Sequence, residues 1–204
     1  MGDALDAVLE RSRALGFLGP GDAAEQRRHA EAFGALLPDA PAVAVDLGSG
    51  GGLPGLVLAA ALPRTRWVLL DAMTKRTSFL DEVVHELGWQ DRVEVVTGRA
   101  EELARERRAT ADVVVARGFG PPAVTAECAA PLLRLGGVLV VSEPPGSTGR
   151  RWPAAGVAEL GLVLDRVVAG PPAFVRLQAT VPCPGRYPRR TGVPAKRPLF
   201  HVEP

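Results

Sequence analysis

Hydrophobic and polar positions follow two alternating periods along most of the chain. Five short apolar runs predict buried strands at 43–48, 66–72, 93–98, 111–117 and 136–142. Between them, apolar residues recur at helical spacing and predict helices at 54–62, 75–87, 100–108 and 121–134. Continuous apolar runs are typical of strands that are covered on both faces of a parallel sheet. The alternation therefore predicts a doubly wound α/β fold with a mostly parallel sheet.

The last third of the chain departs from this alternation. A predicted helix at 153–161 leads to two further apolar runs, 163–169 and 173–181, which are joined only by Gly-Pro-Pro. So short a connection fits a hairpin and cannot form a parallel crossover. We therefore expect a seven-stranded sheet that ends in an antiparallel hairpin.

Two short helices are expected in front of the first strand. The periodicity covers 3–15 and 22–37, and Asp22 is a suitable N-cap. We accordingly expect an N-terminal helical appendage at residues 1–42 and one main domain at residues 43–204.

Composition narrows the class of protein. Hydrophobic residues make up 47% of the 204 residues and charged residues 23%, and no apolar run approaches the roughly 18 residues of a membrane span. The N-terminus lacks the basic and then apolar pattern of a signal peptide. Two cysteines and three histidines are scattered without metal-ligand spacing. We expect a cytoplasmic protein without a metal site.

The net charge of +1 hides an asymmetry along the sequence. Residues 150–204 contain nine basic and three acidic residues, and six of the basic ones lie between Arg176 and Arg197 without an acid among them. This basic C-terminal segment, 176–199, is either a surface that faces phosphates or a solvated tail.

The densest group of glycines follows the first predicted strand. Gly50, Gly52 and Gly55 satisfy the dinucleotide-binding fingerprint, which is a weak signal alone. A second alignment places Asp46 just before glycines 48, 50 and 52. A carboxylate there suits a ligand with an ammonium group and is unfavourable beside a pyrophosphate. Together with the closing hairpin, it favours S-adenosylmethionine over a dinucleotide.

Three further positions at strand ends are candidates for the same ligand. Asp71 ends the second strand and could accept hydrogen bonds from ribose hydroxyls, or could instead cap a helix. Arg99, Ala100 and Glu101 follow the third strand, where an adenine edge would be read, although acids also suit a first helical turn. Arg117 ends the fourth strand at the edge where open α/β sheets bind ligands.

Four stretches of the chain together resemble one protein family. They are the loop from Asp46 to Gly55, Lys75-Arg76 with Phe79-Leu80, the turn from Gly98 to Glu102, and the tail Arg186-Tyr-Pro-Arg-Arg-Thr-Gly-Val-Pro-Ala-Lys-Arg-Pro-Leu199. The loop is similar to many methyltransferases, whereas the long tail is specific. Over about residues 26–199, the chain resembles the bacterial 16S ribosomal RNA guanine-N7 methyltransferases, the RsmG or GidB family.

The resemblance implies a class I, Rossmann-like methyltransferase that acts on ribosomal RNA or the small ribosomal subunit. Together with the strand-end pattern, it gives the expected cofactor-binding residues Asp46, Gly48, Ser49, Gly50, Gly52, Leu53, Asp71, Ala72, Arg99, Ala100, Glu101 and Arg117. The expected RNA-binding residues are Arg186, Arg189, Arg190, Lys196 and Arg197. Guanine N7 has no proton to lose, so no catalytic base is expected, and catalysis would come from positioning. Arg117 is also a candidate for orienting the acceptor.

Two alternatives stay open at this point. The chain reads Ser142-Glu143 where the family usually has a lysine followed by glycine, and an acid is unfavourable beside RNA phosphate. With the modest net charge, this favours a related methyltransferase with a small-molecule acceptor. The other alternative is a binding module that keeps the fold without transferring a methyl group.

Overall fold

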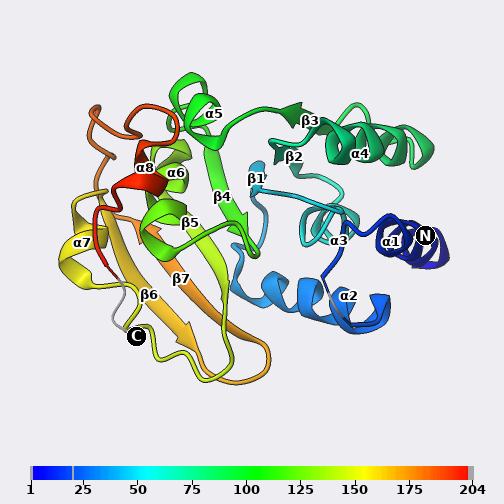
Figure 1. Ribbon diagram of the computed structural model, residues 1–204, viewed down its shortest axis with the longest axis horizontal. Helices are drawn as coiled ribbons and strands as arrows, with labels where there is room; N and C mark the ends of the chain where they lie inside the picture. The colour runs from blue at the N-terminus through cyan, green and yellow to red at the C-terminus, as the bar shows by residue number, and fades with distance from the viewer. Residues whose placement is uncertain (1, 20, 202–204) are drawn as a thin grey trace.

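The computed structural model describes residues 2–19 and 21–201, so the last three residues of the predicted main domain lie outside the described residues. Seven strands form one sheet in the order β3-β2-β1-β4-β5-β7-β6 (Figure 1). Their bounds are β1 Val43–Leu47, β2 Arg66–Asp71, β3 Val93–Thr97, β4 Ala111–Ala116, β5 Leu133–Glu143, β6 Leu162–Val168 and β7 Ala173–Ala179.

The sheet has the predicted mixture of directions. The first five strands pair in parallel, and β7 lies antiparallel between β5 and β6. Both the doubly wound class and the closing hairpin are therefore confirmed. The carboxyl ends of β1, β2 and β4 lie at one edge because the three strands are parallel, and the strand order reverses between β1 and β4.

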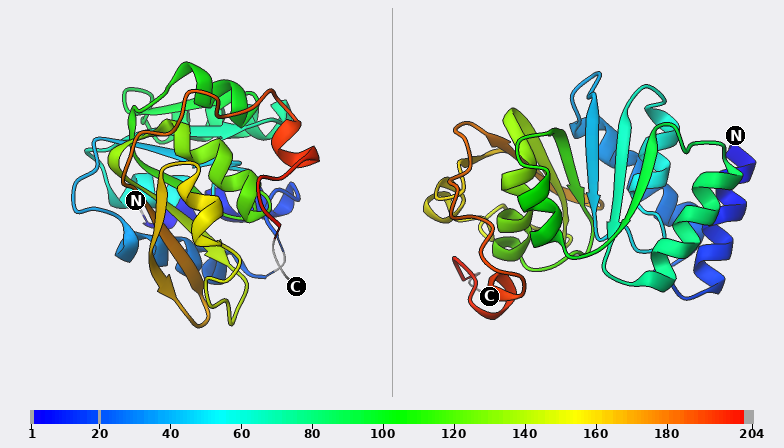
Figure 2. Two further views of the ribbon diagram at one scale, coloured as in Figure 1. Left: turned by 90° about the vertical axis from the view of Figure 1, so that its left-hand side faces the viewer. Right: turned by 90° about the horizontal axis from the view of Figure 1, so that it is seen from above.

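Helices cover both faces of the sheet (Figure 2). Their bounds are α1 Gly2–Ala14, α2 Ala23–Ala32, α3 Gly55–Ala61, α4 Thr74–Glu86, α5 Ala100–Glu106, α6 Pro122–Ala129, α7 Ala154–Ala158 and α8 Val193–Lys196. Buried side chains of α1 to α4 pack on one face, with Trp67, Leu69 and Val113 of the strands. Those of α5 to α7 pack on the other face, with Val68, Leu70 and Val114. Alternate residues of each strand therefore supply separate cores.

The N-terminal helices are part of the first of these cores. Leu9 of α1 and Phe33, which follows α2, are fully buried in it. Asp22 caps α2 as predicted, because its Oδ1 accepts from the amide of Glu25 at 2.6 Å. Ser12 of α1 donates to the carbonyl of Gly51 in the glycine loop at 2.9 Å. The predicted appendage at residues 1–42 thus packs into the same core as the strands and reaches the candidate site.

The start of β5 differs from the sequence expectation. The predicted helix at 121–134 is wrong at its end, since α6 ends at Ala129 and a short 3-10 turn, Ala130–Leu132, leads directly into β5. Gly136 has a φ of 81°, and a Cβ on Gly137 would lie 2.9 Å from the carbonyl oxygen of Arg134. The two glycines therefore allow an irregular, longer strand. The short helix α8 was also not expected. No helix within the described ranges is long and apolar enough to cross a membrane.

Candidate functional site

A tight loop joins the end of β1 to α3 at the carboxyl edge of the sheet. Gly48, Gly50 and Gly52 have φ angles of 71°, 55° and 101°, which side chains disfavour. The amide of Ser49 donates to the carbonyl of Leu70 on β2 at 2.9 Å. The loop is therefore fixed against the neighbouring strand in a conformation that only glycine adopts without strain.

Asp71 ties this loop to the end of β2. Its Oδ2 accepts from the amide of Gly50 at 2.9 Å, and its Oδ1 accepts from the amide of Met73 at 2.8 Å. Arg76 lies 3.4 Å from the same carboxylate. The residue before α4 is Met73, so Asp71 does not cap that helix. Each carboxylate oxygen has two lone-pair sites, so Asp71 can accept further hydrogen bonds from a ligand.

Asp46 lies beneath the loop and is fully buried. Its Oδ2 accepts from the amide of Gly55 at 2.9 Å, which fixes the first turn of α3. Its Oδ1 is buried without a hydrogen-bond partner among the described residues. Burial raises the pKa of Asp46 to about 7, although the hydrogen bonds from Gly55 and Ser49 oppose that shift. The site therefore has a carboxyl group that is ready to accept one more donor or cation.

Arg117 follows β4 and provides the opposite charge. Its Nη2 donates to Oε1 of Gln26 on α2 at 2.8 Å, while its Nη1 is buried without a partner in the part of the chain that the structure describes. Burial lowers the pKa of Arg117, and the negative charge of Asp46 opposes this shift. A guanidinium with a buried donor that has no partner is an anchor for a carboxylate or phosphate.

Two pockets open at this edge of the sheet and share Gly48. The first contains Gly48, Asp71, Ala72, Arg99, Ala100 and Glu101 of the predicted residues. The second contains Gly48, Ser49, Gly50, Leu53 and Arg117. Phe119 stands at the junction, because a Cβ on Gly48 would lie 2.9 Å from its ring. Asp46 and Gly52 line neither pocket and lie behind the loop.

The first turn of α5 forms one wall of the first pocket. Glu101 is only 3% exposed, and its Oε1 accepts from the amide of Gly192 in the tail at 2.8 Å. Arg99 is about half exposed, and its Nε lies 3.7 Å from Oε2 of Glu101. Glu101 therefore connects the pocket to the C-terminal tail.

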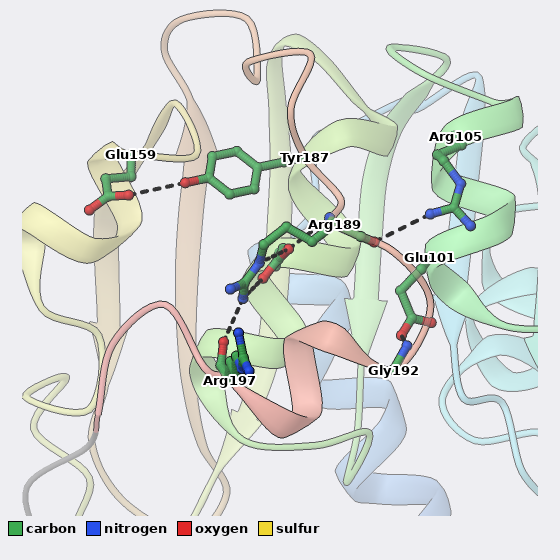
Figure 3. A network of polar contacts seen from close by, with 8 residues as sticks. Glu101, Arg105, Glu159, Tyr187, Arg189, Gly192 and Arg197 are labelled. Atoms are coloured by element: carbon green, nitrogen blue, oxygen red, sulfur yellow. Dashed lines mark hydrogen bonds and ion pairs between the residues drawn. The ribbon is translucent and has the colours of Figure 1, made fainter.

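The predicted RNA-binding residues have two different environments. The side chains of Arg186, Arg190, Lys196 and Arg197 are exposed. Arg189 instead points inward and pairs with Glu127 of α6 (Figure 3). Four of these five residues are therefore available on the surface.

Glu143 has internal partners. Its side chain is 1% exposed, and it accepts hydrogen bonds from Ser147, Arg151 and Trp152 at 2.7, 3.0 and 3.1 Å. It holds the loop after β5 and does not present a free charge to an acceptor.

Several residues that line the pockets were not predicted from the sequence. The first pocket also contains Leu70, Gly98, Phe119, Gly120, Pro121, Val124, Cys128 and Ala195, and the second contains Phe17, Leu18, Gly19, Gln26, Gly51, Arg76 and Gly118. Phe119 could have been found, since it lies two residues beyond the strand-end Arg117. The residues between 17 and 26 carry no such signal, because tertiary packing brings them to the loop.

Neither pocket contains a metal cluster. Within residues 2–19 and 21–201, no group of three His, Cys, Asp or Glu side chains could hold a metal ion.

Comparison with known proteins identifies relatives of this chain. Residues 32–143 match a family model described as GidB, rRNA small subunit methyltransferase G. The ribosomal RNA small subunit methyltransferase G of Parasynechococcus marenigrum is 35% identical to this chain, over 79% of this chain and 69% of that protein. The protein of the same name from Moorella thermoacetica is 36% identical, over 76% of this chain and 68% of that protein. The one from Deinococcus radiodurans is 40% identical over 76% and 65%. The chain thus spans about two thirds of the length of these relatives.

Solved structures agree on the fold. A methyltransferase from Geobacter sulfurreducens superposes with a TM-score of 0.64 at 17% identity, over 86% of this chain and 90% of that one. The cofactor-bound protein Rv0187 from MTB gives 0.62 at 22% identity, over 87% and 90%. At such identities the similarity concerns the fold alone.

Proposed function

The chain belongs to the rRNA small subunit methyltransferase G family, and we propose that it transfers a methyl group from S-adenosylmethionine to N7 of a guanine in 16S ribosomal RNA. The observation that carries this proposal is the pair of pockets that meet at Gly48. One pocket has residues suited to an adenosine, and the other has a half-buried arginine suited to an amino-acid carboxylate. An activity on ribosomal RNA would lie in the cytoplasm.

The second pocket fits the methionine part of the cofactor. Arg117 lines it, and Nη1 of this residue is buried without a partner among the described residues. Asp46 lies behind the loop, and its Oδ1 is likewise buried without a partner among the described residues. An unpaired buried donor is costly, and the carboxylate of a zwitterionic ligand would pair with the one on Arg117. Arg117 would bind the carboxylate, and the negative field of Asp46 would favour the ammonium group.

The first pocket fits the adenosine part. Asp71 lines it and retains lone pairs for ribose hydroxyls. Ala100 and Glu101 begin α5 at the point where an adenine edge would lie. Val124 and Cys128 of α6 supply an apolar side for the ring.

The proposed reaction requires little proton transfer by the protein. When bound, S-adenosylmethionine would supply a sulfonium methyl group, which the neutral lone pair of guanine N7 would accept as S-adenosylhomocysteine leaves. Because N7 has no proton to lose, the protein need only hold the acceptor in line and exclude water. This explains why the pockets require no general base. Phe119 and Arg117 lie next to Gly48 and are suited to limit where the acceptor can enter.

An RNA acceptor is supported by the surface around the first pocket. Arg186, Arg190, Lys196 and Arg197 are exposed on the tail, and Ala195 of that tail lines the pocket. The small-molecule alternative relied on Glu143, which is buried and paired with Arg151. Since that acid is occupied inside the protein, it would not repel phosphate at the site.

The test is methyl transfer to defined acceptors. The protein is incubated with S-adenosylmethionine carrying a labelled methyl group and with small ribosomal subunits, free 16S RNA or a small-molecule extract. We expect label in the RNA, at a position where borohydride and aniline cleave the chain, since N7-methylguanosine is sensitive to that treatment. Label in the extract alone would contradict an RNA acceptor, and no label in any fraction would contradict a transferase.

A matched pair of variants tests whether Arg117 in the second pocket anchors the cofactor. Arg117→Gln should abolish most of the transfer, because the carboxylate anchor is removed. Arg64→Gln should leave it unchanged, since Arg64 is exposed before β2 at the opposite edge of the sheet.

A further inference from the structure

The C-terminal tail runs along the outer surface of α6 and α5. We call residues 183–199 the strap. Its only helix is α8, which contacts α6 (Figure 1). Tyr187, near the start of the strap, is buried, and its hydroxyl donates to Oε2 of Glu159 at 3.1 Å. Arg108 donates to the carbonyls of Tyr187 and Cys183. The strap is therefore fastened to the protein before it reaches the pocket.

The central fastening is an ion pair between Arg189 and Glu127. Glu127 is fully buried on α6, and it accepts from the amide, Nε and Nη2 of Arg189 at 2.9, 2.9 and 2.6 Å. Nη2 of Arg189 also donates to the carbonyl of Arg197 at 2.7 Å, which closes the strap on itself (Figure 3). These hydrogen bonds raise the pKa of Arg189. A fork of this kind requires a planar guanidinium.

A second fastening joins the strap to α5. Gly192, with a φ of 81°, donates its amide to Oε1 of Glu101 at 2.8 Å. Arg105 donates to the carbonyl of Arg189 at 3.3 Å and to the hydroxyl of Thr191 at 3.0 Å. Glu101 lies in the first turn of α5 and lines the first pocket, so its side chain connects the strap directly to the pocket wall.

The strap also reaches the pocket itself. Ala195 lines the first pocket together with Ala100 and Cys128, which lie across from it on α5 and α6. Ala195 lies between the two strap residues that are fastened to Arg189 and Glu101, since Gly192 precedes it and Arg197 follows it. The position of this wall therefore depends on both fastenings.

We propose that Arg189 is a positioning residue for the cofactor, which acts by holding the strap as a wall of the first pocket through its ion pair with Glu127. The inference rests on the proposed function, because it concerns the same cofactor. It divides the cations of the tail into two groups. Arg189 faces inward and supports the pocket, while Arg186, Arg190, Lys196 and Arg197 have side chains exposed for phosphate.

The experiment measures binding of S-adenosylhomocysteine, the reaction product, by titration calorimetry on the full chain. Arg189→Lys keeps the charge but loses the fork, and we expect its Kd to rise about tenfold. Ala195→Leu leaves the ion pair intact and fills the pocket, so its Kd should rise by at least as much. Arg64→Lys is the matched control on an exposed arginine at the opposite edge of the sheet, and its Kd should stay within about twofold of the wild type.

Kinetics separate positioning from a loss of folded protein. For Arg189→Lys we expect a raised KM for S-adenosylmethionine and a kcat that approaches the wild-type value at saturating cofactor. A lower kcat at unchanged KM would overturn the inference, as would wild-type binding by Arg189→Lys, whatever the Kd of Ala195→Leu. Those results would leave the proposed function standing. No binding by the wild type would instead overturn the cofactor assignment itself.

Discussion

The buried Asp46 and the half-buried Arg117 lie at the ends of the adjacent strands β1 and β4, and each has one buried polar atom without a partner among the described residues. Groups of this kind are rare in protein interiors because each loses its hydration without compensation. They concentrate at functional sites, where a ligand supplies the missing partner. At the scale of single residues, the candidate pocket is therefore built to be completed by a charged molecule.

The raised pKa of Asp46 predicts an unusual pH dependence of stability. The folded protein keeps this carboxyl protonated up to about pH 7, while the unfolded chain ionises it near pH 4. The free energy of unfolding should therefore fall as the pH rises from about 4 to about 7, by roughly 4 kcal/mol at most, and then level off. Asp46→Asn is neutral throughout and should lack this fall. Urea denaturation of both proteins between pH 4 and 8 measures the difference.

Other titrating groups are the same in both proteins, so they cancel when the two curves are subtracted. A difference between Asp46→Asn and wild type that stays constant over this pH range would contradict a raised pKa for Asp46.

Gly48 should tolerate no side chain. In Gly48→Ala, a residue with a φ of 71° would carry a Cβ 2.9 Å from the ring of Phe119, at the junction of the two pockets. We expect weaker cofactor binding in addition to about 1–2 kcal/mol of backbone strain. Gly88→Ala is a matched control, with a φ of 66° and open space around its Cβ. It should show the strain without the loss of binding, and equal Kd values for both variants would contradict the steric argument.

At the scale of secondary-structure elements, the loop after β5 is held by one carboxylate. Glu143→Ala would remove the acceptor of the buried Trp152 indole and the partner of Arg151. An unsatisfied buried donor costs about 1–3 kcal/mol, so we expect a lower free energy of unfolding by that amount. Thermal and urea denaturation check it. Glu106→Ala, which removes an exposed acid on α5, should be close to neutral.

Glu143→Ala also tests whether this acid affects binding of an RNA acceptor. RNA affinity of Glu143→Ala should match the wild type once the protein is folded, because Glu143 faces inward. A marked gain in RNA affinity would mean that this acid repels phosphate after all.

Elements were predictable where local pattern determines them. The apolar run at 43–48 gave β1 almost to the residue, and Gly-Pro-Pro between two apolar runs indicated the hairpin of β6 and β7. The start of β5 was not predictable in this way, since Pro131 and the glycines 136 and 137 decide it through backbone detail that periodicity does not contain.

The candidate site was predictable in its glycine loop and strand ends for the same reason. Asp71 and Arg117 stand where parallel strands end, which a pattern can locate. Glu127 and Arg189 are 62 residues apart, and Gln26 and Arg117 are 91 apart. Such pairs depend on how the folded elements pack, so a single sequence gives them no periodic signal.

At the scale of the whole molecule, basic charge lies on one segment of an otherwise slightly acidic protein. Residues 1–149 hold fifteen basic and twenty acidic residues, whereas 150–204 hold nine and three. Non-specific attraction for a polyanion would therefore depend on that segment, and it would bring RNA to the side of the protein where the first pocket opens.

Binding of single-stranded RNA should weaken steeply with salt. If the four exposed cations of the strap contact phosphates, the logarithm of the association constant should fall with the logarithm of salt concentration with a slope of about −3. Arg190→Ala should reduce the magnitude of this slope by about 0.7. Arg64→Ala, at the opposite edge of the sheet, should leave it unchanged. Fluorescence anisotropy across a salt series measures all three proteins, and a flat response in the wild type would contradict an RNA surface.

The strap follows all seven strands in the sequence, and this order has a consequence during synthesis. A chain emerging from the ribosome can complete its sheet and the core that contains α1 to α4 before Ala195, which lines the first pocket, has been made, because folding proceeds from the N-terminal side. The nascent protein would then be compact yet unable to retain its cofactor. The ability to transfer a methyl group would arise in a separate, late step, when Arg189 forms its ion pair with Glu127 on α6.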